Sequence, residues 1–300
     1  MWTCAKAFSS SANLGPGFDV LALAHDAYFD IVCVKETEGF EVVKVTGEWK
    51  VPKENNNALV VARLAAEKLG LKGAEIWVHK GVPPGRGLGS SGATAAATVK
   101  AMELLAGKSL SVEEAVAIAA EGERAVSGSP HADNVGASYL GELIAVTYNP
   151  FSVVKFEVPE VKLVVATPWV DVPPSKTGEA RKVLPEEIKL QDAVQLIGGT
   201  ALVIKALTEG NLELLGKAIM MDTVVTPRRK ALIPCYDEVL KAVLKSGASG
   251  MTISGAGPSV LIVGGEEAGR AAVEAWEKCG VRATFKVVTP APGARAHPPP

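Results

Sequence analysis

Residues 83–97, PPGRGLGSSGATAAA, place a glycine- and serine-rich loop directly before an alanine-rich helix. Gly85, Gly87 and Gly89 let the backbone turn sharply and approach a ligand without a Cβ in the way. The pair Ser90-Ser91 occupies the expected N-cap and first-turn positions of the helix. Because a helix start carries free N–H groups and a partial positive charge, this stretch predicts a cradle for an anion, phosphate above all.

Two familiar phosphate motifs do not match this loop. A Walker A loop needs a lysine immediately before its Ser or Thr, whereas Leu88-Gly89 precedes Ser90 here. A dinucleotide-binding GxGxxG motif would need its third glycine at the position of Ser90. On the loop alone, the alternative is an ordinary glycine-rich turn between a strand and a helix.

Composition limits the class of protein. The 300 residues are 48% hydrophobic, which is enough for one large hydrophobic core or for two of ordinary size. For a chain of this length we expect two cores. A formal charge of −2 without a dense Lys/Arg tract predicts no nucleic-acid partner and no membrane-surface partner. We find no apolar run of bilayer-spanning length and no signal-peptide pattern at the N-terminus, so we expect a soluble, cytoplasmic protein.

The four cysteines are scattered along the chain, at Cys4, Cys33, Cys235 and Cys279. No CxxC or Cys/His spacing could collect a metal ion, and we expect these side chains to be small buried hydrophobic groups. Glutamine occurs at two positions, a weak sign of heat adaptation that leaves a cytoplasmic disulfide open.

Strands and helices fall into separate groups, which predicts an α+β fold. Apolar alternation and β-branched runs predict strands at 2–7, 29–35, 40–46, 74–79, 142–148, 153–158, 161–167, 249–254, 259–263 and 282–288. Helices are predicted at 56–70, 90–106, 111–126, 187–208, 211–220, 235–246 and 266–279, with a capping box formed by Ser111 and Glu114. We predict an N-terminal domain over 1–155, a C-terminal domain over 156–290 with a loop at 171–186, and a disordered proline-rich tail over 291–300.

Two further loops of small residues stand out, at Ser11–Asp19 (SANLGPGFD) and Ser254–Ser259 (SGAGPS). Taken singly, the first is explained as well by an Asx-turn and the second by a hairpin-like turn. Together with GLGSSGA at Gly87–Ala93 they resemble the three motifs of the GHMP kinase superfamily. A fourth segment, SGSPHADNV at Ser127–Val135, resembles the homoserine kinase branch of that superfamily.

The resemblance implies a two-domain GHMP kinase fold. Its N-terminal α+β domain is similar to a ribosomal-protein fold and its C-terminal domain is ferredoxin-like, with nucleotide and substrate in the cleft between them. The implied reaction transfers a phosphoryl group from ATP to the side-chain hydroxyl of L-homoserine, as a step toward threonine. Such a transfer depends on positioning and charge neutralisation.

The resemblance also assigns residues to ATP and Mg²⁺. The implied nucleotide contacts are Asn57, Pro83, Pro84, Gly85, Arg86, Gly87, Leu88, Gly89, Ser90, Ser91, Gly92 and Ala93. Ser91 and Glu123 are implied metal ligands, because Mg²⁺ prefers oxygen donors. Charge pattern alone does not distinguish Glu123 from Glu121, and Asn57 is explained equally well as a helix cap.

Other residues are assigned to the amino-acid substrate and to the chemistry. Asp19 would bind the ammonium group, and Arg181 and Arg229 the carboxylate, since guanidinium groups fork onto carboxylates. Arg228 is a rival to Arg229. The remaining implied roles belong to His131 at the substrate, to Asn13 and Asn134 at the reacting hydroxyl, and to Thr177 near the γ-phosphate.

Some features depart from the family pattern or stay open. Phe8-Ser9-Ser10 stands where the family usually has Pro-Ala-Thr, and Thr226 where a Glu is common. No strong general base is evident, so we expect catalysis by positioning and phosphate stabilisation. The alternatives are another GHMP kinase acting on shikimate or mevalonate, and a non-catalytic ligand-binding module. The sequence leaves the oligomeric state open, a homodimer included.

Overall fold

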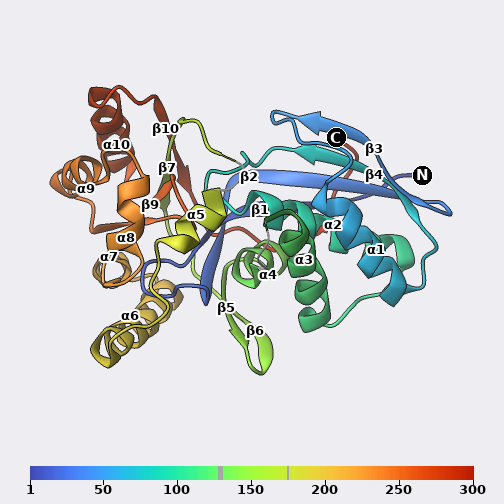
Figure 1. The fold of residues 1–300 in the computed structure, drawn as a ribbon, viewed down its shortest axis with the longest axis horizontal. Helices are drawn as coiled ribbons and strands as arrows, with labels where there is room; N and C mark the ends of the chain where they lie inside the picture. The colour runs from blue at the N-terminus through green and yellow to red at the C-terminus, as the bar shows by residue number, and fades with distance from the viewer. Residues whose placement is uncertain (128–130, 174–175) are drawn as a thin grey trace.

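A computed structural model describes residues 1–127, 131–173 and 176–300, which form two α+β halves that lie side by side (Figure 1). In the first half, the described residues build a seven-stranded sheet in the order β11-β1-β2-β4-β3, with β5 on the other end of β2 and β6 beside it. Its strands are β1 (Thr3–Ala12), β2 (Leu21–Glu36), β3 (Phe40–Gly47), β4 (Ala74–Lys80), β5 (Leu143–Tyr148), β6 (Phe151–Phe156) and β11 (Arg295–Ala296). The pairs are antiparallel except β3 with β4, which is parallel.

One group of helices covers this sheet: α1 (Asn57–Leu69), α2 (Ser90–Ala106), α3 (Val112–Ser127) and α4 (Ala132–Leu140). Small side chains on α2, among them Ala95, Ala96 and Ala97, are fully buried and let this helix pack closely on the strands. The predicted capping box starts α3, because the Ser111 hydroxyl accepts from the Glu114 N–H at 3.2 Å. The helix α4 was missed by the sequence analysis.

The second half is built on a four-stranded antiparallel sheet of described residues in the order β10-β7-β9-β8. Its strands are β7 (Leu163–Pro168), β8 (Gly250–Ile253), β9 (Val260–Val263) and β10 (Ala283–Val288), and its main helices are α6 (Leu190–Thr208), α7 (Leu212–Ile219), α9 (Tyr236–Lys245) and α10 (Glu266–Lys278). This order is that of the ferredoxin-like βαββαβ arrangement. The boundary expected after residue 155 stays a prediction; it falls at the last residue pair of β6, and β7 begins the sheet of the second half.

Alternating residues of β7 face two different cores. Val164 and Ala166 pack with α9 and α10, whereas Leu163 and Val165 face a core that also contains Leu14 of the first loop. Leu88 of the glycine-rich loop belongs to this same core. The two halves are therefore joined by buried apolar side chains directly behind the loops singled out in the sequence.

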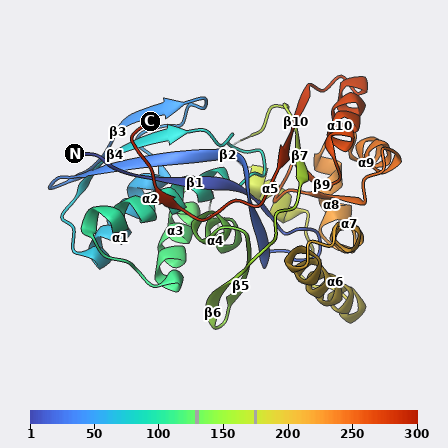
Figure 2. The ribbon, with the colours of Figure 1, turned by 180° about the vertical axis from the view of Figure 1, so that it is seen from behind.

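Several sequence expectations are wrong. The segment 291–300 is not a disordered tail: Lys6 and Ala5 of β1 pair with β11, and Ala291 is fully buried. An extended proline-rich segment can serve as an edge strand, and Figure 2 shows it running from β10 to lie along β1. The loop expected at 171–186 contains a helix, α5 (Lys176–Lys182).

Another correction concerns the expectation that no apolar run is long enough to span a bilayer. Among the described residues one helix, α6, is long and apolar enough to cross a membrane by length and composition alone. A single helix of this kind is weak evidence for a membrane span. One side of α6 is buried through Val203, Ala206 and Leu207, and Leu190 on the other side is 81% exposed.

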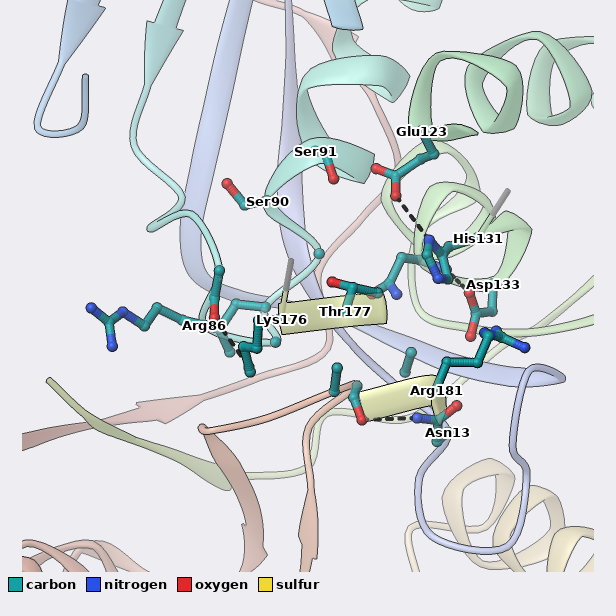
Figure 3. A pocket seen from close by; sticks show the side chains of 18 of the residues that line it. Asn13, Arg86, Ser90, Ser91, Glu123, His131, Asp133, Lys176, Thr177 and Arg181 are labelled. Carbon is teal, nitrogen blue, oxygen red and sulfur yellow. Dashed lines mark hydrogen bonds and ion pairs between the residues drawn. The ribbon is translucent and has the colours of Figure 1, made fainter. Parts of the chain in front are cut away.

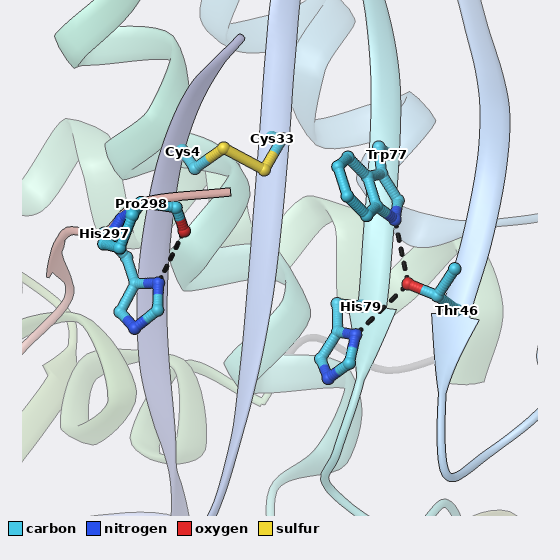
Figure 4. The surroundings of a disulfide bond; sticks show 7 residues. All are labelled: Cys4, Cys33, Thr46, Trp77, His79, His297 and Pro298. Atoms are coloured by element: carbon cyan, nitrogen blue, oxygen red, sulfur yellow. Dashed lines mark hydrogen bonds between the residues drawn. A yellow bond between two sulfur atoms is a disulfide. The ribbon is translucent and has the colours of Figure 1, made fainter. Parts of the chain in front are cut away.

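The cysteines form two disulfides, Cys4–Cys33 and Cys235–Cys279, a pairing that the sequence left open. Cys4 and Cys33 are buried as expected, whereas Cys235 is half-buried and Cys279 is exposed. Cys4 and Cys33 lie directly opposite each other on β1 and β2 (Figure 4). This bridge therefore crosses the two central strands of the first sheet.

A buried ion pair lies beneath the glycine-rich loop, between Lys80 on β4 and Asp30 on β2, whose side chains are 4% and 0% exposed. Asp30 accepts from the N–H groups of Gly81 and Val82, each at 2.9 Å. Lys80 also donates to the carbonyl of Ser90 at 2.7 Å. The pair thus fixes both the start of the loop and the start of α2.

We expect Lys80→Met to lower the free energy of unfolding by about 3–5 kcal/mol, because the Asp30 carboxylate would remain buried without its partner. Lys35→Met is the matched control: it removes a lysine from an exposed pair with Glu75 and should cost less than about 1 kcal/mol. Urea denaturation at neutral pH measures both. Equal losses in the two variants would contradict this account of the buried pair.

Candidate active site

One cavity between the two halves gathers residues from all the loops identified in the sequence (Figure 3). It is lined by Ala12, Asn13, Asp19, Gly85, Arg86, Gly87, Leu88, Gly89, Ser90, Ser91, Glu123, His131, Asp133, Asn134, Lys176, Thr177, Arg181, Arg229, Gly255 and Ala256. Most of the predicted site residues are therefore brought together. Of those predicted for ATP, this lining leaves out Asn57, Pro83, Pro84, Gly92 and Ala93.

Every second residue of the glycine-rich loop has a left-handed backbone: φ is 70° at Gly85, 74° at Gly87 and 63° at Gly89. A Cβ on Gly87 would lie 2.2 Å from the carbonyl oxygen of Ser254, and one on Gly89 would lie 2.2 Å from the Ser10 hydroxyl. Glycine is thus required there for space as well as for backbone conformation.

Each of the four carbonyl groups from Gly85 to Leu88 accepts a hydrogen bond from another segment. The donors to residues 85, 86, 87 and 88 are, in order, the Lys176 ammonium (3.1 Å), the Ser259 N–H (3.2 Å), the Ser254 hydroxyl (2.6 Å) and the Ser10 N–H (3.1 Å). Because the carbonyls are held by the protein, the loop presents its N–H groups to the cavity. Successive N–H groups in such a loop form a concave anion site.

The helix start differs slightly from the expectation. The N-cap of α2 is Gly89 in the left-handed region, and Ser90 is the first helical residue. The Ser90 hydroxyl donates to the carbonyl of Val82 at 2.9 Å, so it stabilises the fold of the loop. In the described part of the chain the Ser91 hydroxyl makes no side-chain hydrogen bond, which leaves it available to a ligand.

Two residues predicted to contact ATP have side chains engaged elsewhere. The Arg86 guanidinium donates to the carbonyl of Val170 at 2.6 Å and lies over the Trp169 ring at 5.2 Å. It points away from the cavity, so only the Arg86 backbone belongs to the phosphate loop. The Asn57 side chain donates to the carbonyl of Ser91 at 2.8 Å and thereby braces the first turn of α2.

A buried chain of polar groups links the third motif to the first two. Burial lowers the pKa of His25 to about 4, so its ring is neutral at physiological pH. The Ser254 hydroxyl has one proton, which goes to the carbonyl of Gly87, an acceptor only. Ser11 must then donate to Ser254 (2.7 Å), and His25 Nε2–H to Ser11 (3.1 Å).

An acidic group lies beside Ser91. Glu123 is buried, 4% exposed, and lines the cavity, whereas the Glu121 side chain is 51% exposed and pairs with Arg124. This placement favours Glu123 over Glu121. His131 Nδ1 lies 3.3 Å from the Glu123 carboxylate; burial acts to lower the pKa of His131, but the hydrogen bond and charge of Glu123 raise it overall.

Asp133 is a cavity residue that the sequence analysis did not include in the site. Burial and the nearby Asp19 charge raise its pKa to about 6. The signal was present in the segment His131–Asn134, where the aspartate stands between two residues that were selected.

Charged residues of both signs meet at the other end of the cavity. Arg181 donates to both oxygens of Asp19, at 3.0 and 2.8 Å. Arg229 is 4% exposed and donates to the carbonyls of Ala180 and Gly255. Arg228 is exposed, bonds to the carbonyl of Val224 and does not line the cavity, which favours Arg229 over Arg228.

The remaining predicted residues line the same space. Asn13 accepts from the Asp19 N–H at 3.1 Å and donates to the carbonyl of Gly255 at 3.0 Å. Asn134 accepts from the Ser10 hydroxyl at 2.9 Å, and Thr177 projects from α5 into the cavity. Their chemical roles stay predictions.

We expect Ser254→Ala to weaken ATP binding about tenfold, because the carbonyl of Gly87 would lose its donor and could turn toward the cavity. Ser246→Ala is the control, since among the described residues that hydroxyl bonds only to the nearby carbonyl of Val243. Isothermal titration with ATP measures both variants. Unchanged affinity in Ser254→Ala would show that the loop keeps its shape without this bond.

The comparisons agree over the whole chain. The models for the GHMP kinases N terminal domain and the GHMP kinases C terminal match residues 56–142 and 203–282. A homoserine kinase of Aeropyrum pernix is 42% identical over 97% of this chain and 96% of its own, and one of Pyrococcus abyssi is 41% identical over 95% and 96%. A crystal structure of homoserine kinase from Cytophaga hutchinsonii superposes with a TM-score of 0.89 at 33% identity, covering 99% of this chain and 97% of that one.

A mevalonate kinase from L. major, solved with R-mevalonate, has a TM-score of 0.65 at 17% identity, which shows the shared fold alone. The family models, the relatives at about 40% identity and the three-motif cavity all agree. The chain belongs to the GHMP kinase family.

Proposed function

We propose that this chain is a homoserine kinase, which transfers the γ-phosphoryl group of ATP to the side-chain hydroxyl of L-homoserine and releases ADP and O-phospho-L-homoserine. The relatives at 42% and 41% identity carry that name over nearly their full length. We place the reaction in threonine biosynthesis and in the cytoplasm.

The observation that carries the proposal is the joining of two complementary sites in one cavity. At one end, the N–H groups of the Gly85–Ser91 loop face the space that a triphosphate would occupy. At the other end, Asp19 and Arg181 form an ion pair close to Arg229. A zwitterionic amino acid matches this end of the cavity. Its ammonium group can pair with Asp19 and its carboxylate with Arg181, in place of the ion pair that these two side chains form with each other.

The substrate end also fits the size and charge of the ligand. Asp133 adds a second acidic group, and its raised pKa reflects the repulsion from Asp19 and the burial that a bound ammonium group would offset. Arg229 is packed over the Phe18 ring at 5.1 Å, which holds its guanidinium plane in place. These groups would fix the amino-acid backbone and direct the side-chain hydroxyl toward the phosphate loop.

The donors at the phosphate end fit Mg²⁺. Ser91 and Glu123 would supply one hydroxyl and one carboxylate, and Mg²⁺ commonly takes only one or two protein ligands together with phosphates and waters. When bound, the ion neutralises the charge of the transferring phosphate. The residues of the chain contribute by holding donor and acceptor in line, with Asn13, Asn134 and Thr177 placed around the reacting hydroxyl.

The direct test compares alcohol substrates in a coupled assay of ADP release. We expect turnover with ATP and L-homoserine, and kcat/KM values at least about tenfold lower with shikimate and mevalonate, because neither offers an ammonium group to Asp19 and Asp133. Faster turnover with shikimate or mevalonate would overturn the choice of substrate. Nucleotide binding without any ADP release would favour a ligand-binding module instead.

A second test separates the two ends of the cavity. We expect Arg181→Ala and Arg229→Lys to raise the KM for homoserine about 10- to 100-fold and to leave the KM for ATP within about twofold, because each removes a forked contact to the carboxylate. Arg228→Ala, on the exposed side of the same helix turn, should leave both constants unchanged. A rise in the KM for ATP with homoserine spared would reverse the assignment.

A further inference from the structure

Lys176 is a cavity residue for which neither the sequence motifs nor the reaction gives a role. It begins α5, and its ammonium group donates to the carbonyl of Gly85 at 3.1 Å (Figure 3). This carbonyl belongs to the first glycine of the phosphate loop. A lysine of the second half of the molecule is thus held at the mouth of a loop that has no lysine of its own.

The surroundings of Lys176 are unfavourable for a cation. In the part of the chain that the structure describes, its hydrogen-bond partner is a neutral carbonyl, and the charges that act on it most are those of Arg86 and Arg229. None of the three acidic groups that line the cavity forms a described ion pair with Lys176: Asp19 pairs with Arg181, the Glu123 carboxylate lies 3.3 Å from His131 Nδ1, and Asp133 accepts from the Asn134 N–H. The titratable side chains that line the cavity with Lys176 are Asp19, Glu123, His131, Asp133, Arg181 and Arg229, and the Arg86 guanidinium lies outside the cavity behind the loop.

We propose that Lys176 binds the terminal phosphates of the nucleotide and supplies, from α5, the lysine charge that the phosphate loop lacks. The inference deepens the proposed function and rests on it. A phosphate on the N–H groups of the loop would lie next to the ammonium, which could exchange a neutral carbonyl for a charge-assisted bond. Lys176 would then stabilise the negative charge that develops on the phosphates during transfer, because its cation is already in position.

The position of Lys176 leads to a measurable proton uptake. Burial, with the charges of Arg86 and Arg229, lowers the pKa of Lys176 to about 7. Above that pH the free protein therefore holds mainly the neutral amine. A bound triphosphate favours the ammonium form and raises the pKa, so nucleotide binding takes up a proton at pH 8 and its affinity falls as the pH rises above 7.

The experiment is isothermal titration of the protein with Mg²⁺ and ATPγS, without homoserine, at pH 8 in two buffers of different ionisation enthalpy. The wild type should take up about one proton on binding. Lys176→Met should bind about 10- to 100-fold more weakly and take up none. Lys176→Arg keeps a charge that does not titrate, so it should retain most of the affinity and also take up none.

Lys182→Met is the matched control, because Lys182 lies on the same short helix and is exposed. It should behave as the wild type in affinity and in proton uptake, and circular dichroism should show all variants folded. Wild-type affinity in Lys176→Met, or an unchanged proton uptake in it, would overturn the proposal. Failure of the homoserine assay would refute the proposed substrate and leave this result readable, since the titration uses nucleotide alone.

Discussion

The outward anchoring of the phosphate-loop carbonyls is the constraint on which the rest of the structure depends. Four successive carbonyls, from Gly85 to Leu88, accept from donors on α5, the third motif and β1. Three of these donors belong to the second half of the molecule. The anion site is therefore not a property of one loop, because its geometry exists only when the two halves are packed together.

The same packing forms the substrate end. Asp19 comes from the turn between the first two strands, and Arg181 and Arg229 come from helices of the second half. Two short helices, α5 and α8 (Thr226–Arg229), are bound to each other by Arg229, which donates to the carbonyl of Ala180. The substrate groups and the phosphate donors thus share one set of supports, so a displacement of α5 as a whole would move both.

Local sequence was sufficient to predict elements whose residues prefer the same conformation that the surrounding structure requires. The alanine run predicted 90–106, and α2 has these bounds. Local sequence was not sufficient where contacts with distant residues determine the conformation. Residues 21–28 were not predicted as a strand, yet they continue β2, which pairs here with β1 and β5. The proline-rich tail is ordered because it pairs with β1. Motif resemblance found Asp19, Arg181 and Glu123, but the roles of Lys176 and Ser254 depend on partners 91 and 167 residues away.

The return of the last residues to the edge of the first sheet has a consequence for how the molecule is made. Strand β11 pairs with β1, and the residues of β1 are synthesised well before those of β11. Ala291, a few residues before it, is fully buried; its N–H donates to the carbonyl of Ala24 on β2, and its carbonyl accepts from the Glu142 N–H. During synthesis the edge of the first sheet at β1 therefore stays unpaired until the residues of β11 have been made.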